Sequence, residues 1–194
     1  MEWAYFKEGT YWIYEEETTG ARDTFTVLTS NDYISNPSTE PYEFFGYTTH
    51  RSSDDYTYWF WFNEGWTFTS GGQKGNCCSC RKIWCDKYTS GNADGEDVLL
   101  AFPTFIGSYS GISFGGGEYG KVEVINYFEE MQVGENIFTN VVVENNENSV
   151  LDQQYASSDY NQVKYYFSRA VGIIRKEIEE NSEIWNLVEY NIVQ

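Results

Sequence analysis

An alternation of apolar and polar residues with a period of two constrains this chain most, and it is clearest near the C-terminal end. Residues 163–168 read VKYYFS, so that Val163, Tyr165 and Phe167 share one face of an extended chain. Gly172, whose missing Cβ permits a bend, precedes a second such run, and a polar turn separates that run from a third. The pattern predicts two or three antiparallel strands that close a sheet.

The same stretch has an alternative interpretation. Residues 173–188 contain lysine, arginine and glutamate, which are good helix formers, and could instead form an amphipathic helix. We favour strands, because β-branched and aromatic residues dominate the flanks.

Aromatic residues make up 19% of the chain, with 17 Tyr, 13 Phe and 7 Trp. Such side chains suit pleated, half-buried surfaces, so the composition favours an all-β fold. A length of 194 residues fits one domain with one core, which we place at 1–194. We predict a single antiparallel meander of roughly eight to eleven strands that curls into a barrel or half-barrel. One short helical turn is expected near residues 151–155.

The formal charge of −18 excludes two classes of partner. Binding to nucleic acid phosphates needs a basic surface, and so does docking of a polybasic patch on anionic lipid. The sequence has no apolar run near the ~20 residues that span a membrane, and no basic and apolar leader follows Met1. Two interpretations remain: a cytosolic protein, or one in which Met1 stands where an export signal has been removed.

Turn residues divide the chain into further hairpins and strands. The expected hairpins join 11–17 with 23–30, 56–62 with 66–69 across Gly65, and 121–131 with 137–144 across Gly134. Further strands are expected at 42–50, 98–105 and 112–114. The segment 70–97 is polar, contains glycine and holds all four cysteines, so we predict a loop excursion there.

Three short motifs carry a resemblance to a known family. Residues 5–14 read YFKEGTYWIY, residues 138–143 read FTNVVV, and residues 165–176 read YYFSRAVGIIRK. They resemble the opening "FPLxxGxYWxYE", a later strand and the closing "YYAxGVGLVK" of uncharacterised secreted lipoproteins of Bacteroidetes. The resemblance implies an exported, lipid-anchored protein whose signal and lipobox cysteine are not in this sequence. It implies no activity, cofactor or catalytic residue.

The four cysteines, Cys77, Cys78, Cys80 and Cys85, form the sharpest local feature. A zinc site would need four thiolates in a tetrahedron, and no second, separated CxxC pair closes one. An exported protein favours disulfides, for which four cysteines allow three pairings. Since adjacent Cys77 and Cys78 do not readily bond each other, we expect each to pair with Cys80 or Cys85. Free thiols and a metal site remain as alternatives.

An acidic motif at residues 92–97 suggests a calcium site. It contains Asn92, Asp94, Glu96 and Asp97, but an EF-hand would need Glu at its twelfth position, where Ala101 stands. A looser calcium loop is therefore the alternative to a solvated turn.

Catalysis has little support in the sequence. His50 is the one histidine, and it would have to lie beside a cysteine to activate it. We predict no catalytic residue and no cofactor.

Aromatic residues at 58–66 suggest a ligand surface. Tyr58, Trp59, Trp61 and Trp66 could line a cavity for an apolar ligand or present rings to a glycan. An ordinary aromatic core is the alternative. Because neighbouring positions in the run are all aromatic, some rings must meet a second layer, a ligand or a partner.

The leading hypothesis is a non-enzymatic cell-envelope or surface lipoprotein domain that binds an apolar or glycan ligand through an aromatic concave face. The alternative is a structural or interaction module with a filled core, used with other proteins in envelope assembly. A hydrolase ranks last. The expected location is the periplasm, outer membrane or cell surface, with membrane contact only through a lipid anchor.

Overall fold

The computed structural model describes part of the chain. The backbone is described for residues 6–35, 42–53, 57–63, 66–70, 73–77, 82–89, 92–101, 106–107, 109–113, 119–147 and 162–193. Side chains are described for 6–30, 46–53, 57–58, 60, 106–107, 122–147 and 162–193. Within these ranges all regular structure is β-strand, and no helix there is long and apolar enough to cross a membrane.

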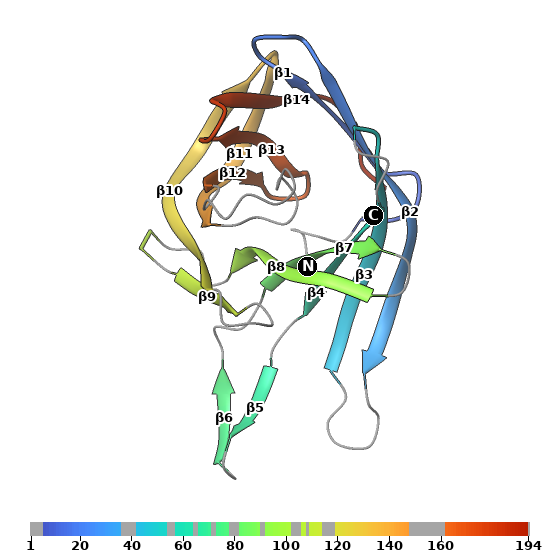
Figure 1. The fold of residues 1–194 in the computed structure, drawn as a ribbon, viewed down its shortest axis with the longest axis vertical. Coiled ribbons are helices and arrows are strands. Elements are labelled where there is room, and N and C mark those ends of the chain that lie inside the picture. The colour runs from blue at the N-terminus through green and yellow to red at the C-terminus, as the bar shows by residue number, and fades with distance from the viewer. Residues whose placement is uncertain are drawn as a thin grey trace.

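Fourteen strands make up the described fold (Figure 1). They are β1 (Tyr11–Glu16), β2 (Arg22–Ser35), β3 (Tyr42–Arg51), β4 (Thr57–Asn63), β5 (Trp66–Ser70), β6 (Gln73–Cys77), β7 (Lys82–Thr89), β8 (Asn92–Ala101), β9 (Tyr109–Ser113), β10 (Tyr119–Val133), β11 (Asn136–Glu147), β12 (Gln162–Ser168), β13 (Gly172–Ile178) and β14 (Glu183–Asn191). Twelve form one sheet in the order β8-β7-β4-β3-β2-β1-β14-β13-β12-β11-β10-β9. The predicted all-β antiparallel meander is confirmed.

The first and last strands meet in the middle of this sheet. β1 and β14 are antiparallel, with Tyr11 opposite Asn191 and Glu16 opposite Trp185. Two side chains of β1 reach past β14: Trp12 donates from Nε1 to the Val171 carbonyl at 2.6 Å, and the Tyr14 hydroxyl donates to the Ile173 carbonyl at 2.8 Å. The sheet therefore consists of two meanders joined along the β1–β14 pair. The first meander contains β1 to β4, β7 and β8, and the second contains β9 to β14.

The sheet curls but stays open among the described residues. Its two outermost strands are β8 and β9, and no ladder joins them. Their Cα atoms nevertheless approach within 8 Å of each other, so the curl is nearly complete. This arrangement fits the half-barrel form of the prediction.

Among the side chains that the structure describes, aromatic rings from the first meander pack together in the core. Phe6 lies edge-on to Trp12 at 4.8 Å between ring centroids, and Tyr47 stacks on Phe60 at 5.1 Å. A fully buried large apolar side chain contributes about 1.5–3 kcal/mol relative to an exposed one, so these rings dominate the core. The other core members come from both meanders and include Tyr14, Phe25, Val27, Tyr58, Val124, Val133, Phe138, Val141, Val142, Val163, Tyr165, Phe167, Ile174, Ile178 and Leu187.

One predicted hairpin is wrong. Residues 56–62 were expected to pair with 66–69, but β4 pairs with β3 and β7, while β5 pairs only with β6 in a separate small sheet. β7 has eight residues and β5 has five, so β7 can match the seven residues of β4 along their whole length. Full-length pairing satisfies more backbone hydrogen-bonding groups than the short return strand could.

The predicted loop excursion at 70–97 is also wrong in large part. It contains β6, β7 and residues 92–97 of β8, and β7 and β8 belong to the main sheet. Of the described strands in this region, β5 and β6 form a hairpin that projects away from the main sheet (Figure 1). These extra strands raise the total above the expected roughly eight to eleven. The helical alternative for 173–188 is excluded by β13 and β14, and the helical turn expected at 151–155 lies outside the described residues.

Candidate functional site

The predicted ligand-binding aromatics divide into two groups. Tyr58 is only 1% exposed and its ring lies 6.1 Å from that of Phe25, so this residue belongs to the core. Trp59 and Trp61 occupy β4 and Trp66 occupies β5, but their side chains lie outside the described residues. Their role in ligand binding stays a prediction.

The two cysteines that lie in described strands belong to different sheets. Cys77 is in β6, opposite Trp66, whereas Cys85 is in β7, opposite Phe60. Cys78 and Cys80 lie outside the described residues, so the predicted disulfides stay a prediction.

The predicted calcium ligands lie in an extended strand. Asn92, Asp94, Glu96 and Asp97 all belong to β8, and β7 pairs with this strand along most of its length. A calcium loop needs a curled backbone that points several oxygens at one ion, and an extended strand does not provide this shape. The solvated turn is therefore wrong for these residues, whereas calcium binding by their side chains, which lie outside the described ones, stays a prediction. Among the residues whose side chains are described, no cluster of three or more His, Cys, Asp or Glu is placed to bind a metal.

In the described strands, His50 is not in register with Cys85 of the same sheet. It lies in β3 opposite Thr26 and Thr57. Cys85 is in register with Phe60 and, through it, with Tyr47. That row lies three residues from His50 along β3, or roughly 10 Å in an extended strand.

A buried polar row crosses five strands, and the sequence analysis missed it. Its residues are in register from strand to strand: Glu144, Tyr165, Lys176, Trp185 and Glu16. All but Trp185, which is half-buried, are buried. The available signal was the position of Lys176, two residues from Ile174 and two from Ile178, which places it on their face of the strand.

Aromatic rings surround the ammonium group of Lys176. Its Nζ lies 5.1 Å from the Trp185 ring and 6.0 Å from the Tyr14 ring. A cation this close to ring faces is stabilised by their negative electrostatic potential, most strongly where water is excluded. The row therefore contains a buried cation that the aromatic core itself stabilises.

Glu16, at the end of the row, accepts hydrogen bonds from the adjoining β1–β2 turn. Its Oε2 accepts hydrogen bonds from the Thr19 backbone N at 2.6 Å, the Thr19 hydroxyl at 2.7 Å and the Thr18 backbone N at 3.0 Å. The bonds from Thr19 are the main reason that the pKa of Glu16 falls to about 2. A carboxylate with these donors holds the β1–β2 turn and remains ionised near neutral pH.

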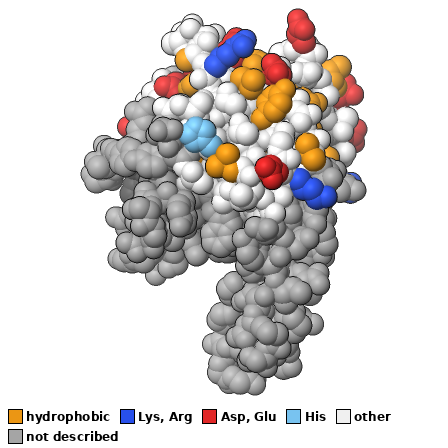
Figure 2. Space-filling model, turned by 90° about the vertical axis from the view of Figure 1, so that its right-hand side faces the viewer, with side chains coloured by type: hydrophobic (Ala, Val, Ile, Leu, Met, Phe, Trp, Pro, Cys, Tyr) orange, Lys and Arg blue, Asp and Glu red, His pale blue; other side chains and the backbone are white. Residues whose placement is uncertain are grey.

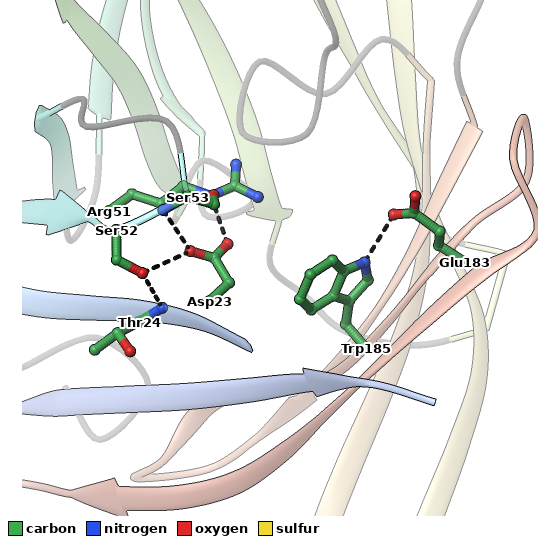
Figure 3. Close-up of polar contacts among 7 residues, drawn as sticks. All are labelled: Asp23, Thr24, Arg51, Ser52, Ser53, Glu183 and Trp185. Atoms are coloured by element: carbon green, nitrogen blue, oxygen red, sulfur yellow. Dashed lines mark hydrogen bonds and ion pairs between the residues drawn. The ribbon is translucent and has the colours of Figure 1, made fainter. Parts of the chain in front are cut away.

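Another buried carboxylate, Asp23, joins β2 to the end of β3 (Figure 3). Its Oδ2 accepts from Arg51 Nε at 2.6 Å, and its Oδ1 accepts from the Ser53 backbone N at 3.2 Å and the Ser52 hydroxyl at 3.4 Å. The Arg51 guanidinium also lies 5.2 Å from the centre of the Phe25 ring. These bonds hold β2 against the end of β3, so Asp23 fits a structural role.

A pocket of about 200 Å³, lined mainly by polar and charged residues, lies across the neighbouring strands β11 to β14. It is lined by Asn145, Gln162, Lys164, Glu177, Ile178, Glu179, Ser182, Glu183 and Ile184. Glu177 is already engaged, because its Oε1 accepts from the Tyr166 hydroxyl at 2.9 Å and from Arg175 Nε at 3.0 Å. Burial and the neighbouring Glu177 raise the pKa of Tyr166 to about 12, so its hydroxyl is not poised to act as a base.

Exposed apolar side chains gather on β10. In the view of Figure 2, on another side of the molecule, hydrophobic side chains are scattered among charged and uncharged ones. On β10, by contrast, residues 125–130 are all exposed, and they include Ile125 (38%), Tyr127 (42%) and Phe128 (36%). This run therefore exposes large apolar side chains on both faces of the strand.

The geometry brings together no nucleophile, base and oxyanion donors around a common point within the described residues. The strongest features of the described residues are the packed core rings, two structural carboxylates, a small pocket lined mainly by polar residues and the exposed run on β10. Comparison with protein-family models, curated proteins and solved structures finds no match for this chain.

Proposed function

We propose that this chain is a non-enzymatic interaction module that meets its partner at its outer surface and sheet margin. The observation that carries the proposal is the close packing of aromatic rings in the described part of the core. Phe6 contacts both Trp12 and Tyr47, and Tyr47 stacks on Phe60. These rings occupy the space that an apolar ligand would need, which favours the filled-core alternative.

The outer pocket supports the same choice. Its volume of about 200 Å³ is below the ~300–1,000 Å³ of pockets that enclose small organic ligands. Several of its polar groups are also engaged with one another, for example Lys164 Nζ with Glu177 Oε2 at 3.9 Å. A ligand would have to displace those contacts.

Glycan binding is the second candidate. The observation that favours it is that Trp61 and Trp84 stand directly opposite each other in β4 and β7. Cross-strand aromatic pairs recur as flat surfaces, and sugar rings bind to such surfaces through their apolar faces. Trp59, Trp61 and Trp66 are the residues to test.

The cell-envelope setting belongs to the same proposal and rests on the resemblance described above. It predicts export, a lipid anchor outside this sequence and a location in the periplasm, outer membrane or cell surface. Disulfides among the cysteines would agree with an oxidising compartment.

Native mass spectrometry of the protein as purified, with and without reductant, tests the proposal. We expect the mass of the bare polypeptide, with no added mass that survives buffer exchange. Each disulfide would lower the mass by about two hydrogens relative to the reduced chain. A retained lipid or other apolar molecule would contradict a filled interior, and binding of oligosaccharides that is lost in Trp61→Ala would favour the glycan alternative.

A further inference from the structure

We infer that the outer margin of β10 binds an extended, basic segment of another protein by adding it as a strand to the sheet. This inference rests on the proposed function and names its surface and the chemistry of the partner. The surface is the β10 edge segment, residues 125–133.

The β10 edge segment begins where the pairing of β10 with β9 ends. β10 has 15 residues, but β9 pairs only with Tyr119–Glu123. The Val124 carbonyl accepts a hydrogen bond from the Gly107 backbone N at 2.8 Å. Beyond it, no described residue forms a ladder on the outer side of β10, whose upper part makes the margin of the sheet in Figure 1. A strand margin of this kind presents backbone N–H and C=O groups for another chain.

The edge segment is held on a firm base. β11 pairs with β10 from Val122 to Val133, and at the hairpin tip Val133 and Phe138 are buried. The Phe138 ring lies 6.0 Å from that of Tyr190 in β14, so the tip is attached to the centre of the sheet. A preordered strand loses little conformational entropy when a partner pairs with it.

The side chains of the edge segment offer apolar contacts on both faces. Tyr127 and Phe128 are neighbours in the strand and point to opposite faces, and each is more than a third exposed. The Tyr127 hydroxyl donates to Asn140 Oδ1 at 2.7 Å, which fixes that ring over the hairpin. In strand addition the backbone supplies affinity, and side chains such as these supply specificity.

The negative charge around the β10 edge segment indicates a basic partner. Residues 122–147 contain six glutamates and no lysine or arginine, and the whole chain has a net charge of −18. Glu129 and Glu130 stand within the exposed run itself. Opposite charges accelerate and stabilise association, so an extended segment in which lysine or arginine alternates with apolar residues is the complementary occupant.

The same charges disfavour a second copy of this chain. Pairing of two β10 margins would bring two acidic hairpins and two strongly negative molecules together. The register of β10 with β11 also shifts between Val124 and Asn126, which bends the margin at one end of the segment. Charged residues and bulges are the features by which sheet margins avoid self-association.

Hydrogen–deuterium exchange with a defined peptide tests the inference. The probe is a peptide of about nine residues, the length of the segment, in which lysine alternates with valine. A peptide in which glutamate replaces each lysine is the charge control, and one N-methylated at alternate residues removes the backbone donors. We expect the lysine peptide alone to slow amide exchange in residues 125–133, less so as salt rises.

Two double variants separate this surface from a general charge effect. Glu129→Lys with Glu130→Lys should weaken peptide binding about tenfold or more. Glu179→Lys with Glu180→Lys makes the same charge change at the exposed β13–β14 turn and should leave protection of 125–133 nearly unchanged. Unaltered far-UV circular dichroism of both variants shows that they fold.

Each contrary result overturns the inference in a recognisable way. Protection elsewhere, equal binding of the N-methylated peptide, or equal loss in both double variants excludes strand addition at this edge. Protection of 125–133 that grows with protein concentration alone assigns the edge to a second copy. None of these results changes the native mass, so failure here is distinct from failure of the proposed function.

Discussion

Replacing Asp23 with alanine tests whether the buried ion pair holds the first meander together. Asp23 is fully buried, and the Arg51 side chain is only 11% exposed. The substitution removes the acceptor of the 2.6 Å bond from Arg51 and of the bonds from Ser52 and Ser53. It leaves the guanidinium at the end of β3 without its carboxylate.

The expected loss in the free energy of unfolding is about 3–5 kcal/mol, because one partner of a buried pair is removed and the other remains. With a urea dependence of ~1–3 kcal/mol per molar, the unfolding midpoint should fall by roughly 1–5 M. Tryptophan fluorescence during urea unfolding measures the midpoint. The loss is a large share of the ~5–15 kcal/mol that stabilises a typical domain.

The exposed pair on the same hairpin provides the matched control. Arg22 Nε lies 2.9 Å from Glu15 Oε2, but these side chains are 62% and 37% exposed. Glu15→Ala should therefore cost less than about 1 kcal/mol. Equal midpoints for Asp23→Ala and Glu15→Ala would refute the reasoning, since burial would then make no difference to two bonds of similar chemistry. In the double variant Asp23→Ala with Arg51→Ala, strictly additive losses would show that the two side chains are not coupled.

Two further predictions concern the turns. The pKa of Glu16 is lowered from 4.5 to about 2 by its bonds from Thr19, so its stabilising effect is complete above about pH 4.5 and is lost as the pH falls toward 2. The urea midpoints of wild type and Glu16→Gln should therefore differ near neutral pH and converge in acid; a constant gap would contradict this. At Gly172, φ is +93° and an added Cβ would lie 3.4 Å from the Phe6 ring. Gly172→Ala should therefore lower the free energy of unfolding, measured by thermal unfolding, by about 1–2 kcal/mol or more. Gly20→Ala, at φ +68° with open space around it, should cost less, and the reverse order would disprove a role for the contact with Phe6.

The local parts of the fold were predictable from the sequence. β12, β13 and β14 lie within a few residues of their expected positions, because alternation, a positive-φ glycine at 172 and a polar turn act over short distances. The partner of β4 was not predictable in the same way. Its pairing with β7 joins residues about 25 apart in sequence, and no local turn signal specifies such a pair.

The site was less predictable, since polar residues occupy positions that a simple pattern assigns to loops or to solvent. Asn92 to Asp97 read as a loop but form part of β8, where pairing with β7 outweighs their low strand propensity. Lys176 and Glu144 carry charge yet are buried in the sheet interior. Both belong to the row of residues that are in register across five strands. The sequence alone does not give that register, so their burial could not be predicted from it.

The pairing of β1 with β14 has a consequence for synthesis on the ribosome. Trp12 and the carbonyl to which it donates are 159 residues apart in sequence. At a synthesis rate of about 5–20 residues per second, the edge of β1 that pairs with β14 stays unpaired for on the order of ten seconds. During that interval the nascent first meander exposes a tryptophan, a tyrosine and a row of unpaired backbone groups. Chaperones that protect such surfaces should therefore matter most for this protein before its last strand emerges.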